Sequence, residues 1–211
     1  MKIISVAAGK GGSCKTTTAI GLATILSQKH KILVVDTDPQ GSLSWVAEKA
    51  NAPFDVAQET DQRVLAKLGY IGGYVALICD TPPGLTSDIL KTTVELSDYV
   101  ILPSPTSPLD IRELTRTISQ IVAPIGKPYR VLLSRVDSRR FNEAMAIQST
   151  LMDKGIPVFN AVVRSRVAHE RAIVEGKLIT QYRGGGAKEA VDDFKRVADE
   201  LLREVGGLKR G

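Results

Sequence analysis

The sequence predicts a single α/β domain built on one doubly wound, mostly parallel β-sheet with helices on both faces. Short apolar runs rich in Val and Ile alternate along the chain with longer segments of helical periodicity. Strands that alternate with helical crossovers require a parallel sheet covered on both sides. The length of 211 residues suits one generous domain, and an apolar content of 43% is ample for its core.

The first strand leads into a glycine-rich turn. Lys2–Ala8 is an Ile- and Val-rich run that predicts a buried strand, and apolar residues recur at helical spacing from Lys15 to Gln28. A strand, a glycine-rich turn and a helix N-terminus in succession form an anion site, because backbone N–H groups converge there and the helix dipole adds positive charge. We expect this turn to bind nucleotide phosphates through Gly9, Lys10, Gly11, Gly12, Ser13, Cys14, Lys15, Thr16 and Thr17.

The rest of the chain continues the alternation of strands and helices. Proline and glycine separate most of the segments. Further strands are predicted at Lys31–Asp36, Tyr74–Cys79, Tyr99–Leu102, Tyr129–Val136 and Pro157–Val163. Further helices are predicted at Ser42–Glu48, Val64–Leu68, Thr86–Leu96, Leu109–Val122, Asn142–Asp153, Ala168–Glu175 and Ala187–Val205. No long linker interrupts this order, so residues 1–211 are expected to form one domain.

The glycine-rich turn carries a variant of the P-loop motif. The general pattern G-x-x-x-x-G-K-[ST] requires glycine where this chain has Cys14. The variant K-G-G-x-x-K-[ST] fits completely from Lys10 to Thr16. On these residues the chain resembles the deviant Walker A ATPases, and most closely the ParA-type partition proteins in their compact form without an N-terminal helix-turn-helix. Lys15 is then the charge on the β- and γ-phosphates of ATP. The resemblance implies that Lys10 reaches the ATP of a partner in a nucleotide-sandwich homodimer.

Carboxylates follow two of the predicted strands, at the edge where such sheets bind ligands. Asp80 follows an apolar run and has the form of a Walker B aspartate, which would hold Mg²⁺ together with the Thr16 hydroxyl. The alternative for a single aspartate at this place is a helix N-cap. Because this aspartate accompanies a P-loop, we expect a magnesium site at this edge of the sheet.

The loop after the second strand strengthens the resemblance. Asp36–Ser42 matches the D-x-D-P-Q-G element of ParA-like proteins, and Asp80–Gly84 matches their D-T-P-P-G element. The resemblance implies that Asp38 orients or polarises the attacking water and that Asp36 lies near the Mg²⁺ shell. The expected catalytic residues are therefore Lys10, Lys15 and Asp38, and the expected metal-binding residues are Thr16, Asp36 and Asp80.

Positive charge is concentrated in one part of the chain. The net charge is +5, and residues 127–183 hold 11 Lys/Arg against 5 Asp/Glu. A basic region of this kind favours a phosphate-backbone partner, with solvated surface charge as the alternative. The resemblance implies that the ATP-bound dimer binds double-stranded DNA without sequence specificity and that a ParB-like or cargo-linked adaptor stimulates hydrolysis. The candidate DNA-binding residues are Arg164, Arg166, Arg171 and Arg183.

Other members of the same superfamily fit the sequence less well. A MinD-like membrane-cycling ATPase needs a terminal amphipathic helix with a basic polar face. The predicted last helix has four basic against six acidic residues there, so no stable membrane association is expected. No apolar run approaches the ~20 residues of a membrane span, and no export signal pattern is present. The expected location is the cytoplasm, with association to the nucleoid when ATP is bound.

Two questions stay open at the level of sequence. Plasmid or chromosome segregation is the first expectation for the cargo, and positioning of a protein organelle such as a carboxysome is the alternative. Cys14 is either a tolerated small residue or a thiol activated by the adjacent lysine and helix N-terminus. The other cysteine, Cys79, lies in a predicted buried strand, so neither a disulfide nor a paired-cysteine cluster site is expected.

Overall fold

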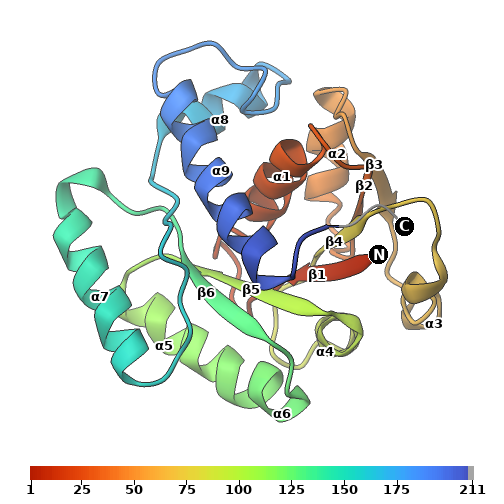
Figure 1. Ribbon diagram of the computed structural model, residues 1–211, viewed down its shortest axis with the longest axis horizontal. Coiled ribbons are helices and arrows are strands. Elements are labelled where there is room, and N and C mark those ends of the chain that lie inside the picture. Colours follow the sequence, from red (N-terminus) through yellow and green to blue (C-terminus); the bar gives the residue numbers. More distant parts are fainter. Residues whose placement is uncertain (209–211) are drawn as a thin grey trace.

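A parallel sheet forms the centre of the protein, as the sequence predicts. The structure, a computed structural model, describes residues 1–208 (Figure 1). Its six strands lie in the order β3-β2-β4-β1-β5-β6, and every adjacent pair is parallel. The strands are β1 (Lys2–Val6), β2 (Ile32–Asp36), β3 (Asp55–Gln58), β4 (Ala76–Asp80), β5 (Tyr99–Ser104) and β6 (Tyr129–Leu133).

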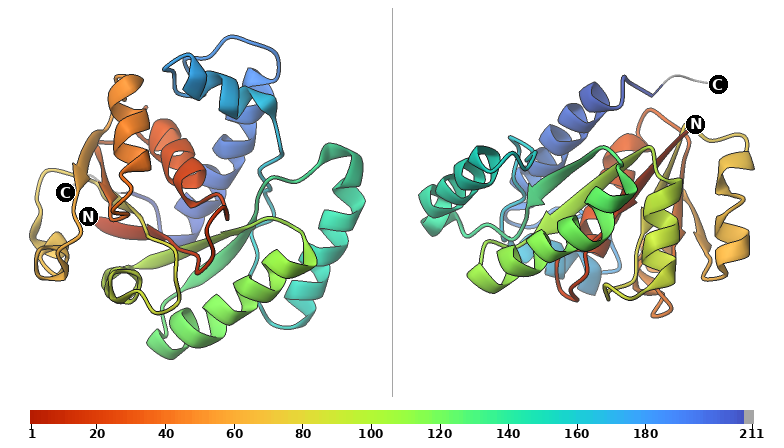
Figure 2. Two further views of the ribbon diagram at one scale, coloured as in Figure 1. Left: turned by 180° about the vertical axis from the view of Figure 1, so that it is seen from behind. Right: turned by 90° about the horizontal axis from the view of Figure 1, so that it is seen from below.

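Helices cover both faces of this sheet (Figure 2). They are α1 (Lys15–Leu26), α2 (Ser42–Lys49), α3 (Gln62–Leu65), α4 (Asp88–Leu96), α5 (Pro108–Thr117), α6 (Ala123–Ile125), α7 (Phe141–Asp153), α8 (Val167–Val174) and α9 (Ala187–Glu204). One apolar cluster joins α1, α2 and α9 to the middle strands, and a second joins α4, α5 and α7 to β5 and β6. Within residues 1–208, no helix combines the length and the apolar character needed to cross a membrane.

The strand register brings the predicted site residues to one edge of the sheet. Val6 pairs with Asp80, and Asp80 pairs with Asp36 on the other side of β4. Because β1 lies between β4 and β5, the glycine-rich turn emerges at the middle of the carboxyl edge. The predicted nucleotide loop and the predicted metal ligands therefore meet at the place where this class of sheet binds ligands.

Two predicted elements differ clearly from the structure, and one observed strand was not predicted. The segment 157–163 is not a strand: near it only isolated bridges form, between Val131 and Val158 and between Val136 and Arg164. The reason is a contact with a distant segment, because the N–H groups of Asn160 and Ala161 donate to the buried carboxylate of Glu200 on α9. The sheet instead gains β3, an edge strand that is largely exposed and lacks the apolar pattern of a buried strand. The helix predicted from Leu109 to Val122 starts with α5 and passes through a π-helical stretch, Ile118–Val122, into α6.

Candidate nucleotide-binding site

Two glycines of the glycine-rich turn border open space. A Cβ atom placed on Gly11 or Gly12 would meet no atom within 4 Å, and both residues line the pocket at the turn. Gly12 takes a left-handed backbone conformation with φ of 75°, which glycine adopts without strain. Backbone N–H groups can thus approach a ligand oxygen closely, as the phosphate-binding prediction requires.

Lys15 lies at the base of the turn. Its side chain is buried, and Nζ donates to the backbone carbonyl of Lys10 at 3.2 Å. Burial lowers the pKa of Lys15, and the negative charges of Asp80 and Asp38 act in the opposite direction. The ammonium group therefore lies within range of the charges of both carboxylates, at the base of the turn that is predicted to bind phosphates.

Thr16 and Asp80 form the part of the site that fits a magnesium ion. The Thr16 hydroxyl donates to Oδ2 of Asp80 at 2.6 Å, while Oδ1 is buried without a hydrogen-bond partner among the described residues. Burial raises the pKa of Asp80 to about 7, and the Thr16 hydrogen bond offsets only part of this effect. A buried carboxylate oxygen without a partner calls for a cation. Mg²⁺ is bound by one or two carboxylates together with substrate phosphates, and the Thr16–Asp80 pair offers one such carboxylate.

Asp36 and Asp38 have different environments although they are two residues apart. Asp36 is fully buried, and its oxygens accept hydrogen bonds from the N–H and hydroxyl of Ser44 and from the N–H of Asp38. Asp36 thus fixes the start of α2 and the loop before it, and its proximity to a metal shell stays a prediction. Asp38 is half-buried, lines the site, and accepts one local hydrogen bond from the N–H of Gln40.

A pocket of about 450 Å³ extends from the glycine-rich turn to the loops after β6. If the turn binds the phosphates, the opposite wall is left for the nucleoside. That wall includes Ser134, Arg135, Val163, Arg164, Ser165, Arg166 and His169. The sequence did not indicate a nucleoside wall, since these residues form no motif. Ser134 and Arg135 fall inside the predicted strand Tyr129–Val136, which ends at Leu133 in the structure, so they lie just beyond its carboxyl end.

Lys10 is held by its own chain. Its Nζ donates to Oδ1 of Asp110 at 2.5 Å, and Oδ2 of Asp110 accepts a hydrogen bond from the Ser107 hydroxyl at 2.6 Å. Burial tends to raise the pKa of Asp110, but the hydrogen bonds from Lys10 and Ser107 and the charges of Lys10 and Arg135 outweigh this and lower it. No motif in the sequence indicated that Asp110 binds Lys10.

Cys14 is a tolerated residue and not an activated thiol. Burial raises the pKa of Cys14 to about 11, and the opposing charges of Arg135 and Lys15 do not overcome it. The idea of a reactive thiol is therefore wrong. The backbone at Cys14 has φ of 70°, a left-handed conformation that a residue with a side chain adopts at a cost.

Replacing Cys14 with glycine is expected to stabilise the fold by about 0.5–1 kcal/mol, because relief of the left-handed strain exceeds the entropy that glycine adds to the unfolded chain. The measurement is the free energy of unfolding from urea denaturation. Cys14→Ala is the matched control: it removes the thiol but keeps Cβ, so it should show no gain. A glycine variant no more stable than the alanine variant would contradict the strain argument.

The four candidate DNA-binding arginines do not form one surface. Arg166 is largely buried, with Nε 3.1 Å from Oδ2 of Asp193, and the guanidinium of Arg164 lies 5.2 Å from the centre of the Phe141 ring. Both side chains line the nucleotide pocket. Arg171 and Arg183 are exposed. The Nε of Arg166 is thus engaged within the protein, and a DNA contact through this residue stays a prediction.

A parallel sheet with a glycine-rich turn at its centre, two lysines in that turn and carboxylates at the neighbouring strand ends defines a P-loop nucleotide-binding protein with a deviant Walker A loop. Residues 4–179 match the family model of the CobQ/CobB/MinD/ParA nucleotide binding domain. The chain belongs to this family, which confirms the resemblance found in the sequence and places the protein among the partition and positioning ATPases.

Two relatives that match almost the whole chain agree with this assignment. "Maintenance of carboxysome distribution protein A" of Gloeobacter kilaueensis is 48% identical over 205 residues, which cover 96% of this chain and 95% of that protein. The protein of the same name from Halothiobacillus neapolitanus is 29% identical over 94% of this chain and 95% of its own length.

Solved structures share the fold. Apo McdA of Cyanothece has a TM-score of 0.76 at 21% identity and covers 95% of this chain and 99% of its own. A plasmid partition protein of Borrelia burgdorferi bound to AMPPNP has a TM-score of 0.76 at 21% identity. The match covers 96% of this chain and 99% of that protein. At this identity the likeness concerns the fold alone.

Proposed function

We propose that this protein is a magnesium-dependent ATPase that positions carboxysomes by cycling on DNA. ATP closes two copies into a sandwich dimer, the dimer binds double-stranded DNA, and an adaptor on the cargo stimulates hydrolysis and release. The observation that carries the proposal is the pair of lysines in the glycine-rich turn: Lys15 is buried and lines the pocket at the turn, and Lys10 lines the neighbouring groove. The choice of cargo rests on the 48% identical relative, which carries this role in its name.

Each residue of the site is expected to have its own role in phosphoryl transfer. Lys15 and the backbone N–H groups of the turn would hold the β- and γ-phosphates, and Asp38 would orient the water that attacks. Thr16 and Asp80 would hold Mg²⁺, which neutralises charge on the phosphate oxygens when it is bound. Because phosphoryl transfer depends mostly on positioning and charge stabilisation, a second cation delivered by the partner, Lys10, is expected to complete the site only in the dimer.

DNA binding is assigned to the exposed cations near the start of α9. Arg183, Lys188 and Lys195 line a groove of about 450 Å³, with Asp192 as the acidic residue among its lining. Arg171, on α8, is exposed as well. Side chains of this kind bind phosphates without reading bases, so binding is expected to fall steeply with salt and to show little sequence preference.

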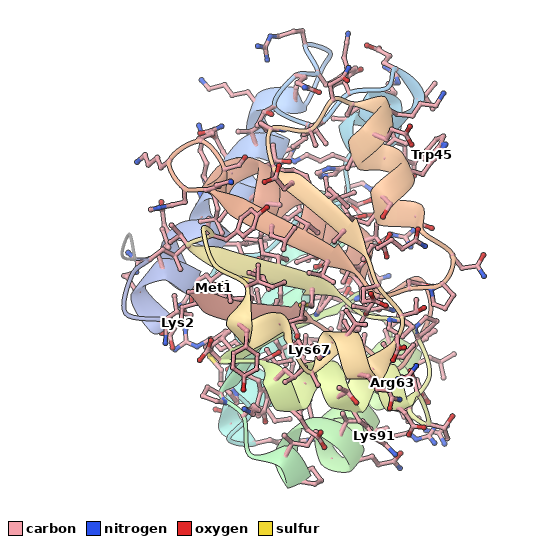
Figure 3. All side chains as sticks on the ribbon, turned by 90° about the vertical axis from the view of Figure 1, so that its right-hand side faces the viewer. Met1, Lys2, Trp45, Arg63, Lys67 and Lys91 are labelled. Atoms are coloured by element: carbon pink, nitrogen blue, oxygen red, sulfur yellow. The ribbon has the colours of Figure 1, made fainter. Side chains whose placement is uncertain are left out.

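Gel retardation of double-stranded DNA tests this surface. Wild-type protein with Mg-AMPPNP should retard DNA, and protein without nucleotide should not. Arg183→Glu combined with Lys188→Glu should weaken binding by at least roughly tenfold and reduce the salt dependence. The matched control is Lys67→Glu with Lys91→Glu, which changes the net charge equally at two exposed positions, one just after α3 and one on α4 (Figure 3). Equal weakening by both pairs would contradict a defined DNA surface.

Deletion of the gene in its native cell tests the cargo. Carboxysomes are expected to lose their even spacing and to cluster, while plasmid and chromosome inheritance stays normal. The check is fluorescence microscopy of a labelled shell protein alongside a plasmid-loss assay. Evenly spaced carboxysomes together with frequent plasmid loss would show that the cargo is a plasmid. The proposed ATPase cycle would still stand in that case.

A further inference from the structure

The Lys10 side chain has two competing destinations. In this structure its ammonium binds Asp110 of the same chain at 2.5 Å. In the proposed dimer it must reach the phosphates of the partner's ATP. The two are alternatives for one side chain, so dimer formation requires that the Lys10–Asp110 ion pair opens.

Opening this pair leaves Asp110 in an unfavourable place. The Asp110 side chain is 15% exposed and would retain the hydroxyl of Ser107 as its hydrogen-bond donor. The 15% exposure holds with Lys10 in place, so after release Asp110 keeps part of its desolvation cost while the attraction of Lys10 is lost. Release of Lys10 is therefore costly unless a second cation takes its place.

Arg135 is in the right place to be that cation. It lines the same groove as Lys10 and Asp110, a space of about 740 Å³. Its side chain is exposed and makes no ion pair or side-chain hydrogen bond within residues 1–208. Its positive charge already acts on the Asp110 carboxyl.

The backbone of Arg135 supports a specific role. Its φ is 52°, a left-handed conformation that arginine adopts at a cost. Left-handed residues other than glycine occur where the surrounding structure fixes them, often at functional sites. Here the conformation occurs at the first residue after the buried Ser134, between the nucleotide pocket and the Lys10 groove.

We propose that Arg135 replaces Lys10 on Asp110 when Lys10 moves to the partner's nucleotide, so that Asp110 and Arg135 are positioning residues that set how readily the dimer forms. The exchange rests on the proposed function, since it requires a nucleotide-dependent dimer with Lys10 acting in trans. Asp110 restrains Lys10, and Arg135 lowers the cost of its release. The two residues therefore have opposite effects on dimerisation.

The test measures the Mg-AMPPNP concentration at which half of the protein is dimeric, by sedimentation velocity. Asp110→Asn keeps the size of the side chain and an oxygen for Ser107, and it should lower this concentration by roughly five- to tenfold. Arg135→Ala should raise it by a similar factor, and Arg135→Lys, which keeps the cation, should restore part of the loss. An unchanged midpoint in Asp110→Asn would overturn the proposal.

A double variant separates the exchange from a direct contact between Arg135 and the nucleotide, whose pocket it also lines. In the Asp110→Asn background, Arg135→Ala should not change the midpoint concentration further, because the carboxylate that Arg135 is proposed to bind is absent. The same rise in both backgrounds would show that Arg135 acts on the nucleotide and would overturn the exchange. Wild-type protein that stays monomeric at saturating nucleotide would contradict the proposed function itself, an outcome distinct from failure of the exchange.

Discussion

Replacing Lys10 with alanine is expected to abolish ATP-dependent dimerisation and to lower turnover by roughly 10³-fold or more, the range seen for cations supplied in trans to phosphoryl transfer. ATP binding by the monomer should persist. The reason lies in what Lys10 contributes to its own loop: its backbone carbonyl accepts from Nζ of Lys15 and the hydroxyl of Ser13, and alanine keeps that carbonyl. The Nζ group itself donates to Asp110, which does not belong to the loop.

Two measurements check this expectation. Light scattering after size-exclusion chromatography in Mg-ATP reports the dimer, and fluorescence of a labelled ATP analogue reports binding. Lys15→Ala is the contrasting variant, because loss of the buried ammonium should remove binding and turnover together. Wild-type turnover in Lys10→Ala would refute the role in trans.

Much of the site could be predicted because its residues are neighbours in sequence. The glycine-rich turn, Lys15 and Thr16 form one continuous segment, and Asp80 ends an apolar run that can only be a buried strand. The pairing of Val6, Asp80 and Asp36 then follows from a parallel sheet with β1 at its centre. Local pattern and global topology specify the same arrangement here, which is typical of a foldable sequence.

The features that sequence did not predict depend on contacts between distant segments. Glu200 of α9 accepts the N–H groups of Asn160 and Ala161 and removes that segment from the sheet, although its apolar pattern suits a strand. Asp193 of the same helix binds Arg166 and takes it away from the surface. Asp110 binds Lys10 from 100 positions along the chain. No local pattern encodes any of these pairings.

Replacing Asp38 with alanine is expected to lower turnover by roughly 10²–10⁴-fold, the contribution of a positioned acid–base group, while the ATP-bound dimer persists. The side chain accepts a single local hydrogen bond, from the N–H of Gln40. Its loss should therefore leave the fold intact, together with the Thr16–Asp80 pair and the buried Lys15. Size-exclusion chromatography should show a dimer that outlasts the wild-type dimer after ATP is added.

Mixing the two inactive variants tests both roles at once. In a mixed dimer, the Lys10→Ala protomer keeps its own Asp38 and receives Lys10 from the Asp38→Ala protomer, so one of the two sites is complete. Activity should therefore return on mixing, although neither variant is active alone. If Lys10 acted within its own chain, every site in the mixture would lack one group and no activity would return. Loss of ATP binding in Asp38→Ala alone would place Asp38 in binding instead of catalysis.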